Sequence, residues 1–369
     1  MRIGILTFHN SDNYGSVLQN YALQEYLSER YHVRTEDINF IPPNTNVVNG
    51  YFEKVSSIRK LIKNLIKASC YRSYQRRRQY FAKFRNNYIH ISDKTYSEDN
   101  ASTIANDYDL VICGGDQIWN TACQDFSWVY YLFHIPVNKK ISYGCSMGAC
   151  KFNDEDWNVI GNAITDFDAV SVREINAVNN IFKYTGIKCS NVPDPTFLLP
   201  QQSYESIARQ CLIDRDFIFI YMINMDPDAM QLASDIASVS GMNAYTIISC
   251  KDSFKLKKYK NIRFVEDSSP EAFIAYIRDA NVVLTNSFHG TAFSLIFNKK
   301  FYTIGSLTND SRILTILTEL NLKDRAVDSI SNVHLNDDID YQSRKEIIDR
   351  FVNTGKHYLD KVFCDEYSM

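Results

Sequence analysis

Several features that define common classes of protein are missing from this sequence of 369 residues. No apolar run reaches the roughly 18 to 20 residues that a transmembrane helix needs, and the apolar centre of MRIGILTFHNSDN is too short for a signal peptide. The nine cysteines are scattered and contain no C-x-x-C pair, so they indicate neither a zinc site nor a disulfide framework. A formal net charge of -3 gives no reason to expect nucleic acid as a partner. We expect a cytoplasmic protein without a metal or other cofactor.

The length predicts more than one domain, since a single hydrophobic core rarely serves so long a chain. The most proline-rich stretch, VPDPTFLLPQQS, marks the joint between two halves. We therefore predict an N-terminal domain over 1–200 with a basic helical insertion over about 54–90, a C-terminal domain over 201–340, and a closing amphipathic helix over 341–369 that could pack on either domain.

Short apolar runs alternate with helical patterns in both halves. RIGILTF, YDLVICGG and KISYGCSMG read as strands in the first half, and DFIFIYMIN, NAYTIIS and NVVLT read as strands in the second. Ser269 and Pro270 are typical of a capped helix start before EAFIAYIRDA. This alternation predicts an α/β fold with two doubly wound, Rossmann-like domains whose sheets are parallel.

Polar clusters follow four of the predicted strands: FHNSDNYG, GGDQIWN, SVRE and NSFHG. Ligands of doubly wound sheets bind at the carboxyl ends of the strands, where loops meet helix N-termini. In NSFHG, the amides that open the helix at Gly290 and Thr291 could bind a phosphate or carboxylate. His289 beside that anion could donate a hydrogen bond or transfer a proton near neutral pH. A core histidine satisfied by the backbone is the structural alternative.

Two arginines could complete an anion site. Arg173 in SVRE could bind a carboxylate or phosphate through two parallel hydrogen bonds, or it could form a salt bridge with Glu174 or another neighbour. Arg312 lies at a predicted helix start in the same half as His289.

The N-terminal loops lack both G-x-G-x-x-G and the Walker lysine, so they predict no dinucleotide site. They do offer hydrogen-bonding groups and stacking faces suited to a sugar, unless these serve only as turns and caps. The candidates are His9, Asn13, Tyr14, Gln19, Asp116, Gln117 and Trp119.

The segment 54–85, KVSSIRKLIKNLIKASCYRSYQRRRQYFAKFR, contains no acidic residue. Its ordinary interpretation is a solvated helix pair whose side-chain stems lie over the sheet. A functional interpretation is peripheral contact with an anionic membrane surface or with a polyprenyl-phosphate carrier at the inner face of the membrane.

Taken in order, the motifs resemble those of the polysaccharide pyruvyl transferases. The matching stretches are GILTFHNSDNYGSVLQNYALQEYL, DLVICGGDQIWN, SYGCSMG, VSVRE, PDPTFLL, SPEAFIAYIRDANVVLTNSFHGTAFSLIFNKKF and NDSRILTILTELNLKDR. The resemblance implies a GT-B-like pair of domains with the active site in the interdomain cleft. It also implies transfer of pyruvate from phosphoenolpyruvate to two hydroxyls of a sugar, possible without metal or nucleotide, in capsular or exopolysaccharide biosynthesis.

The same resemblance assigns Arg173 and His289 to the donor site, together with Ser287, Phe288, Gly290, Thr291 and Arg312. Many members of the family have R-L-H-G where this chain has S-F-H-G, so Ser287 and Arg312 would replace the missing arginine. Asp116 or His9 could accept the hydroxyl proton of the acceptor, which could be lipid-linked. The alternatives are a glycosyltransferase that uses a nucleotide sugar, with Glu266 reading the nucleotide, and a non-enzymatic carbohydrate-binding module.

Overall fold

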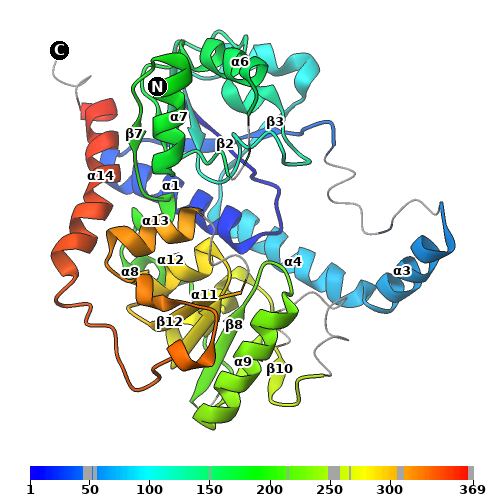
Figure 1. Cartoon of the computed structure of the whole chain (residues 1–369). Coiled ribbons are helices and arrows are strands. Elements are labelled where there is room, and N and C mark those ends of the chain that lie inside the picture. The colour runs from blue at the N-terminus through cyan, green and yellow to red at the C-terminus, as the bar shows by residue number, and fades with distance from the viewer. Residues whose placement is uncertain are drawn as a thin grey trace. The chain divides into compact units, whose positions relative to one another are not determined.

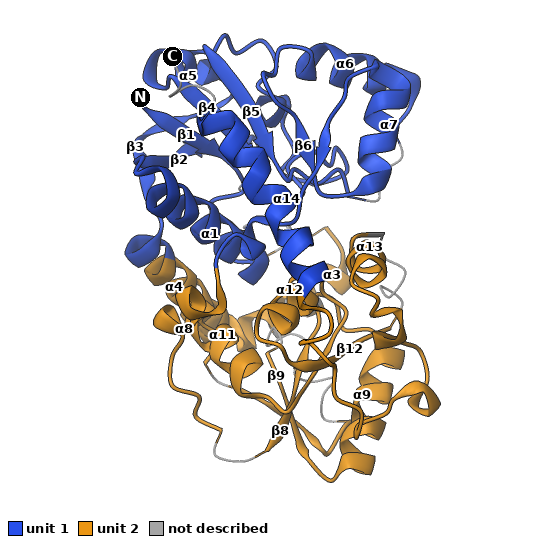
Figure 2. Cartoon of the chain, turned by 90° about the vertical axis from the view of Figure 1, so that its left-hand side faces the viewer, with its two compact units in different colours: residues 1–49, 85–199, 346–369 blue, residues 50–84, 200–345 orange. Residues whose placement is uncertain are grey.

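A computed structural model of the chain describes residues 1–44, 52, 56–148, 150, 152–213, 216–247, 258–265, 267–305 and 311–364 (Figure 1). The chain divides into two compact units (Figure 2). Unit 1 comprises 1–49, 85–199 and 346–369, and unit 2 comprises 50–84 and 200–345. The chain thus passes from unit 1 to unit 2 inside the proline-rich stretch.

The basic segment differs from the predicted arrangement, because residues 50–84 group with unit 2 and are not an insertion in the N-terminal domain. One reason is visible at Tyr80, whose ring lies 5.7 Å from the guanidinium of Arg209 in unit 2. The closing helix α14 (Lys345–Cys364) packs on unit 1. There Tyr358 donates a hydrogen bond of 2.7 Å to the Ser142 carbonyl, and Phe363 stacks on Tyr31.

Unit 1 is built on a parallel sheet with the strand order β3-β2-β1-β4-β5. The strands are β1 (Ile3–Leu6), β2 (Thr35–Phe40), β3 (Ile91–Tyr96), β4 (Leu110–Gly114) and β5 (Lys139–Tyr143). A short parallel pair, β6 (Ser171–Val172) and β7 (Ser190–Asn191), is joined to the β5 side by single bridges. Every residue of β1 and β4 is buried, as expected for central strands covered on both faces.

Unit 2 repeats this architecture with the order β10-β9-β8-β11-β12-β13, and again all pairs are parallel. Its strands are β8 (Phe217–Tyr221), β9 (Asn243–Thr246), β10 (Ile262–Phe264), β11 (Val282–Thr285), β12 (Lys300–Ile304) and β13 (Ala326–Val327). These two sheets confirm the predicted α/β class with two doubly wound domains.

Helices connect successive strands in both units. In unit 1 they are α1 (Tyr14–Tyr31), α5 (Ile104–Asp107), α6 (Asp154–Ile164) and α7 (Ile175–Thr185). Unit 2 contains α3 (Ile58–Ser69), α8 (Gln201–Ile207), α9 (Pro227–Ser240), α11 (Pro270–Asp279), α12 (Phe288–Ile296) and α13 (Ser311–Glu319), and α4 (Tyr71–Tyr88) continues from unit 2 into unit 1. The predicted cap of α11 is confirmed, since the Ser269 hydroxyl accepts a hydrogen bond of 3.1 Å from the Ala272 amide.

A buried carboxyl group joins α1 to the sheet of unit 1. Asp37 in β2 is fully buried and accepts hydrogen bonds from the side-chain amides of Asn20 and Gln24, both on α1. Burial raises the pKa of Asp37 to about 7, although these two hydrogen bonds oppose the shift. The carboxyl therefore holds its proton in the folded protein over a range where the unfolded chain has released it.

This difference makes stability depend on pH. Between pH 5.5 and 7 the folded state binds one proton more than the unfolded state at Asp37, so the free energy of unfolding should fall as the pH rises, by up to about 1.4 kcal/mol per unit. This contribution becomes constant above about pH 8, where Asp37 is ionised in both the folded and the unfolded state. Urea denaturation of the wild type and of Asp37→Asn from pH 5.5 to 8.5 measures the effect. The free energy of unfolding of Asp37→Asn should fall less steeply with pH than that of the wild type. If the two proteins show the same dependence on pH, Asp37 does not have the raised pKa.

Candidate active site

Both sheets reverse their strand order at the first strand. In unit 1, β1 lies between β2 and β4, and in unit 2, β8 lies between β9 and β11. Doubly wound sheets bind ligands at this point, beyond the carboxyl ends of the strands. The loops there are 7–13 and 115–120 in unit 1, and 222–226 and 286–287 in unit 2. Nearly all of the sequence-predicted site residues lie in these loops or in the helix turns that follow them.

Asp116 is the centre of a polar network in unit 1. Its backbone has a φ of 47°, in the left-handed region that is costly for a residue other than glycine, and Gly115 before it has a φ of 58°. The Asp116 carboxylate accepts hydrogen bonds from the Ser16 hydroxyl and from the Gln117 amide, the latter at 2.8 Å. This strained turn holds the carboxylate at the start of α1.

A second link extends the network to two further motifs. The Ser146 amide donates a hydrogen bond of 2.8 Å to the Asp116 carbonyl, and the Ser146 hydroxyl donates to the Glu174 carboxylate. Ser16, Asp116, Ser146 and Glu174 come from four of the motifs that carried the family resemblance. The structure therefore brings these four loops together at one edge of the unit 1 sheet.

Some predicted acceptor residues are part of this framework and have little access to a ligand. Trp119 is fully buried, stacks on Tyr131 at 4.7 Å and donates a hydrogen bond to the Tyr130 carbonyl. The prediction that its indole stacks on a sugar is therefore wrong for this structure, because the hydrophobic core occupies both the ring and its N–H. Asn13 and Gln117, by contrast, are exposed and half-buried respectively.

Gln19 and Tyr14 are also buried. Gln19 donates to the Thr7 hydroxyl and the Ser16 carbonyl, and a side chain on Gly115 would lie 1.6 Å from its Oε1 atom. Gln19 and the glycine thus fit against each other, which fixes the loop after β4. Tyr14 is 1% exposed in the first turn of α1. Both residues support the loops 7–13 and 115–120 from within.

The loop after β1 is fixed by an arginine that the sequence pattern assigned to the basic segment. Arg85, at the end of α4, donates hydrogen bonds of 3.1 Å to the Ser11 carbonyl and to the Asp12 carboxylate, and it is buried. His9 in the same loop lies 3.2 Å from the Asn39 side-chain oxygen. Burial lowers the pKa of His9, and the nearby Arg85 lowers it further. His9 is therefore a neutral imidazole at pH 7, the form that can accept a proton.

A second carboxyl group lies near Asp116. Burial raises the pKa of Asp125, and the like charge of Asp116 raises it further. The sequence reading missed Asp125, because it stands apart from the GGDQIWN motif and only the fold brings it within electrostatic range.

Arg173 forms a buried ion pair with Asp194. The two side chains are 2% and 0% exposed, and Nη1 of Arg173 donates to the Asp194 carboxylate. The other oxygen of Asp194 accepts hydrogen bonds from the amide and the hydroxyl of Thr196, at 2.9 and 2.7 Å. The sequence left open whether Arg173 binds an anionic ligand or forms a salt bridge. The structure contains the salt bridge, with Asp194 of the PDPTFLL motif as the partner.

The NSFHG motif opens helix α12 in unit 2. The Ser287 hydroxyl caps the helix by accepting from the Gly290 amide at 3.3 Å. Thr285 supports this turn, since its hydroxyl accepts from the Ser287 amide at 3.0 Å and donates to the Tyr221 carbonyl at 2.6 Å. His289 is buried at 7% exposed, as are Ser287 at 1% and Thr291 at 0%, and the Nε2 atom of its imidazole is buried as well.

Two neighbouring groups complete this edge of unit 2. The guanidinium of Arg312, at the start of α13, lies 6.0 Å from the centre of the Phe288 ring, so it places a positive charge beside the first turn of α12. Asn286, which the sequence reading did not single out, accepts from the Ile223 amide and donates to the Asn224 carbonyl. It thereby ties the two loops at the switch point together.

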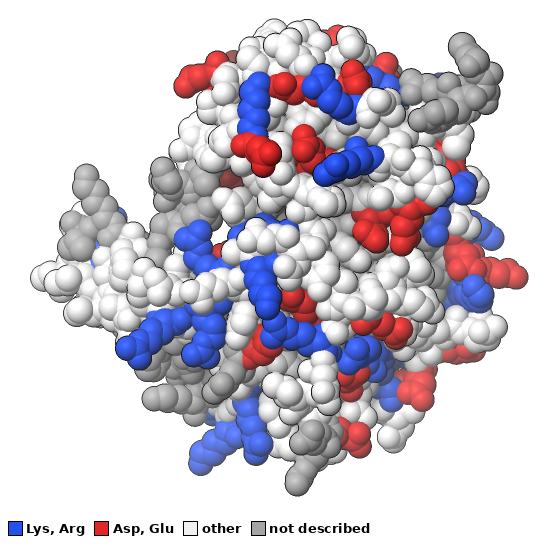
Figure 3. All heavy atoms as spheres, turned by 180° about the vertical axis from the view of Figure 1, so that it is seen from behind, with Lys and Arg blue, Asp and Glu red and all other residues white. Residues whose placement is uncertain are grey.

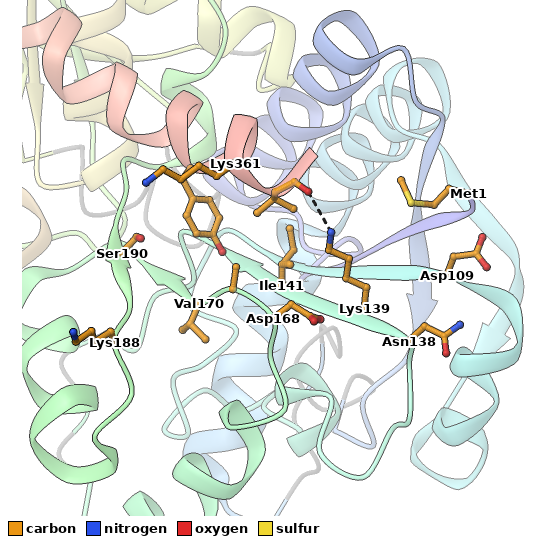
Figure 4. Close-up of a pocket in the computed structure, with 13 residues that line it drawn as sticks. Met1, Asp109, Asn138, Lys139, Ile141, Asp168, Val170, Lys188, Ser190 and Lys361 are labelled. Atoms are coloured by element: carbon orange, nitrogen blue, oxygen red, sulfur yellow. Dashed lines mark hydrogen bonds between the residues drawn. The ribbon is translucent and has the colours of Figure 1, made fainter. Parts of the chain in front are cut away.

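A pocket of about 800 Å³ lies at the opposite edge of the unit 1 sheet, where β5 begins (Figure 4). It is lined by Lys139, Lys188 and Lys361 among others, and Lys139 donates to the Val362 carbonyl at 3.2 Å. None of the predicted site residues lines it. In the part of the chain that the structure describes, no group of three or more His, Cys, Asp or Glu side chains could hold a metal ion. Glu266 lies outside the described residues.

The family model of the polysaccharide pyruvyl transferases matches residues 13–307. The match covers most of the chain, including the loop 115–120 of unit 1 and the loops 222–226 and 286–287 of unit 2, and the chain belongs to this family. A comparison with curated protein sequences found no match.

Solved structures with a similar fold include the following three proteins. One comes from Listeria monocytogenes and is provisionally assigned as a UDP-N-acetylglucosamine 2-epimerase. Its TM-score is 0.56 at 8% identity, and the alignment covers 100% of this chain and 97% of that protein. The UDP-GlcNAc 2-epimerase of Methanocaldococcus jannaschii has a TM-score of 0.51 at 11% identity, with 96% and 92% covered. MnaA of S. aureus, solved with UDP, has a TM-score of 0.50 at 10% identity, with 96% and 90% covered. At these identities the likeness concerns the fold, and it confirms the predicted GT-B-like class.

The close fit of Gly290 against β11 gives a testable consequence. A side-chain carbon at this position would lie 2.2 Å from Oγ1 and 2.9 Å from Cβ of Thr285. Gly290→Ala should push the first turn of α12 away from the strand and weaken phosphoenolpyruvate binding at least tenfold, about 1.4 kcal/mol. Isothermal calorimetry measures the change. Gly161→Ala in α6 is the control, because its nearest contact would be a Thr185 methyl group at 3.2 Å. Equal affinities for wild type and Gly290→Ala would contradict this geometry.

Proposed function

We propose that this protein transfers pyruvate from phosphoenolpyruvate to two hydroxyls of a sugar, forming a pyruvate ketal in the biosynthesis of a bacterial capsular or exopolysaccharide. The observation that carries the proposal is the family match over residues 13–307, which includes the loop 115–120 of unit 1 and the start of α12 in unit 2. The network of Asp116 in unit 1 and the first turn of α12 in unit 2 are polar sites at the edges where such folds bind ligands.

We assign donor binding chiefly to unit 2. The Gly290 amide donates to the Ser287 hydroxyl and the Thr291 amide to the Ser287 carbonyl, so these two amides do not serve an anion as the sequence predicts. The start of α12 can stabilise the phosphate or carboxylate of phosphoenolpyruvate through its dipole, and Arg312 adds a full positive charge. Ser287, Phe288, Gly290 and Thr291 shape this turn. Arg173 of unit 1 is proposed to share in donor binding, and its ion pair with Asp194 would fix the orientation of the guanidinium.

The chemistry requires one proton to reach the methylene carbon of phosphoenolpyruvate. We propose His289 as its source, so that positive character develops at the carbon that bears the phosphate. The first sugar hydroxyl adds to that carbon and loses its proton to a base. The carbon–oxygen bond to phosphate then breaks, and the second hydroxyl adds and closes the ketal, while its proton leaves with the phosphate. Cationic groups at the site would stabilise the departing phosphate.

Acceptor binding is proposed for unit 1. Asn13, Asp116 and Gln117 are not buried and can hydrogen-bond to sugar hydroxyls, and the Asp116 carboxylate or the neutral imidazole of His9 can take the first hydroxyl proton. Because phosphoenolpyruvate is a cytoplasmic metabolite, we propose that the reaction occurs in the cytoplasm. A lipid-linked acceptor would bring it to the inner face of the membrane.

Product analysis tests the proposal. The protein is incubated with phosphoenolpyruvate and a panel of glycosides that carry vicinal or 4,6-related hydroxyl pairs, and phosphate release and pyruvate ketals are followed by NMR and mass spectrometry. Ketal formation that depends on the protein and on the acceptor supports the function. Transfer of a sugar from UDP-sugars to the same glycosides, without any ketal, would overturn it in favour of a glycosyltransferase.

A further inference from the structure

Helix α3 exposes an apolar stripe that nothing in the described part of unit 2 covers. Ile58, Leu61, Ile62 and Leu65 are 78%, 46%, 53% and 64% exposed. Their spacing of three and four residues places all four on one face of the helix. Helix α11 of the same unit shows the usual arrangement, because its apolar residues from Ala272 to Ile277 are buried. The sequence-based expectation that the basic helices lie over the sheet therefore does not hold for α3.

The rest of α3 carries only positive charge. The helical spacing places Lys60 and Lys67 opposite the stripe and Arg59 at its flank, and α4 continues with Arg72, Arg76, Arg77 and Arg78. Between Ser56 and Phe84 the sequence contains no Asp or Glu. Figure 3 shows the corresponding segment at the left, with uncharged atoms at its end and Lys and Arg side chains along its lower edge.

We propose that α3 is a membrane-binding helix that lies in the interface of an anionic bilayer, with its apolar stripe among the acyl chains and its cations at the lipid headgroups. An exposed apolar face opposite a basic face is the pattern of helices that bind in the plane of a membrane. Within the described residues no helix is long and apolar enough to span a bilayer. The inference deepens the proposed function, because a lipid-linked acceptor would be met at such a surface.

Charge favours a bilayer over a second copy of the chain as the occupant. Two copies of α3 packed along their apolar stripes would bring cations of the same sign together with no acidic residue from 56 to 84 to balance them. An anionic lipid surface supplies the opposite charge, and each Lys or Arg near it adds to the attraction.

Vesicle binding of the full-length protein tests the inference. Co-sedimentation is measured with vesicles of phosphatidylcholine alone and with vesicles that also contain phosphatidylglycerol. We expect at least tenfold tighter partitioning onto the anionic vesicles. Leu61→Ala/Leu65→Ala should weaken that binding at least tenfold, since alanine keeps the helix but removes apolar surface. The matched control is Leu212→Ala/Val239→Ala, which removes aliphatic side chains that are 76% and 74% exposed elsewhere in unit 2.

Three results would overturn the inference: no preference for anionic vesicles, equal binding by the Leu61→Ala/Leu65→Ala variant, or a dimer in sedimentation velocity that this variant dissociates. Binding of an RNA oligonucleotide that Arg59→Gln/Lys60→Gln abolishes, without vesicle binding, would also overturn it in favour of a nucleic-acid surface. The assay uses neither donor nor acceptor, so it can fail while ketal formation on a water-soluble glycoside is retained. Conversely, vesicle binding can be observed even if no ketal is formed.

Discussion

Replacing His289 with alanine should lower kcat for ketal formation by a factor of about 10² to 10⁴, the range that positioned general acids contribute. The imidazole lies buried in the first turn of α12. In the proposed mechanism it delivers the proton to the methylene carbon of phosphoenolpyruvate, so its loss should slow that step. Steady-state kinetics with saturating phosphoenolpyruvate measures the loss, and KM should change much less than kcat.

The control for this experiment is His357→Ala, which removes an exposed imidazole from α14. It should leave kcat unchanged. Thermal denaturation of both variants separates a catalytic loss from a folding defect. A His289→Ala protein that is folded and retains wild-type kcat would contradict the role of the imidazole as the proton donor.

Breaking the buried ion pair of unit 1 should cost about 3 to 5 kcal/mol of stability, because removal of one partner leaves the other charge buried without compensation. Asp194→Ala is the direct test, since both side chains are almost completely buried. The double variant Arg173→Met/Asp194→Leu removes both charges and should recover most of that loss. Urea denaturation of the wild type, Asp194→Ala and the double variant measures the free energy of unfolding of each protein.

A surface ion pair supplies the comparison. Arg30 and Asp360 lie 3.2 Å apart with side chains 54% and 29% exposed, so Asp360→Ala should cost much less stability than Asp194→Ala. The double variant also separates stability from function. If it is folded but does not bind phosphoenolpyruvate, Arg173 acts on the donor as well as on the fold. If it is folded and binds phosphoenolpyruvate with wild-type affinity, Arg173 serves the fold alone.

The strands that bury both faces could be predicted from the sequence, because β1, β4, β8 and β11 are short continuous apolar runs. The edge strand β3 could not, since four consecutive polar residues stand between Ile91 and Tyr96 and three side chains of the strand are exposed. Its position depends on pairing with β2, which no local pattern records. Residues 50–84 were assigned to the wrong domain for a similar reason, because contacts such as that between Tyr80 and Arg209 join distant parts of the sequence.

In the candidate site, too, local features could be predicted from the sequence and long-range contacts could not. Motif spacing identified the strand-end loops and the helix start at His289, because loop and cap residues have local signatures. It did not distinguish a polar side chain that faces a ligand from one that holds a loop. Trp119 and Gln19 proved to be buried supports. Arg85 appeared to be one more surface cation, yet it is the buried partner of Asp12.

The central claim is that the protein binds phosphoenolpyruvate as its donor. Calorimetric titration of the purified protein with phosphoenolpyruvate, beside Gly290→Ala and Gly161→Ala and with UDP-sugars as the control ligands, tests it most directly. Saturable phosphoenolpyruvate binding that Gly161→Ala retains and Gly290→Ala weakens, with no heat from UDP-sugars, is the predicted result. Binding of a UDP-sugar without binding of phosphoenolpyruvate would contradict the claim.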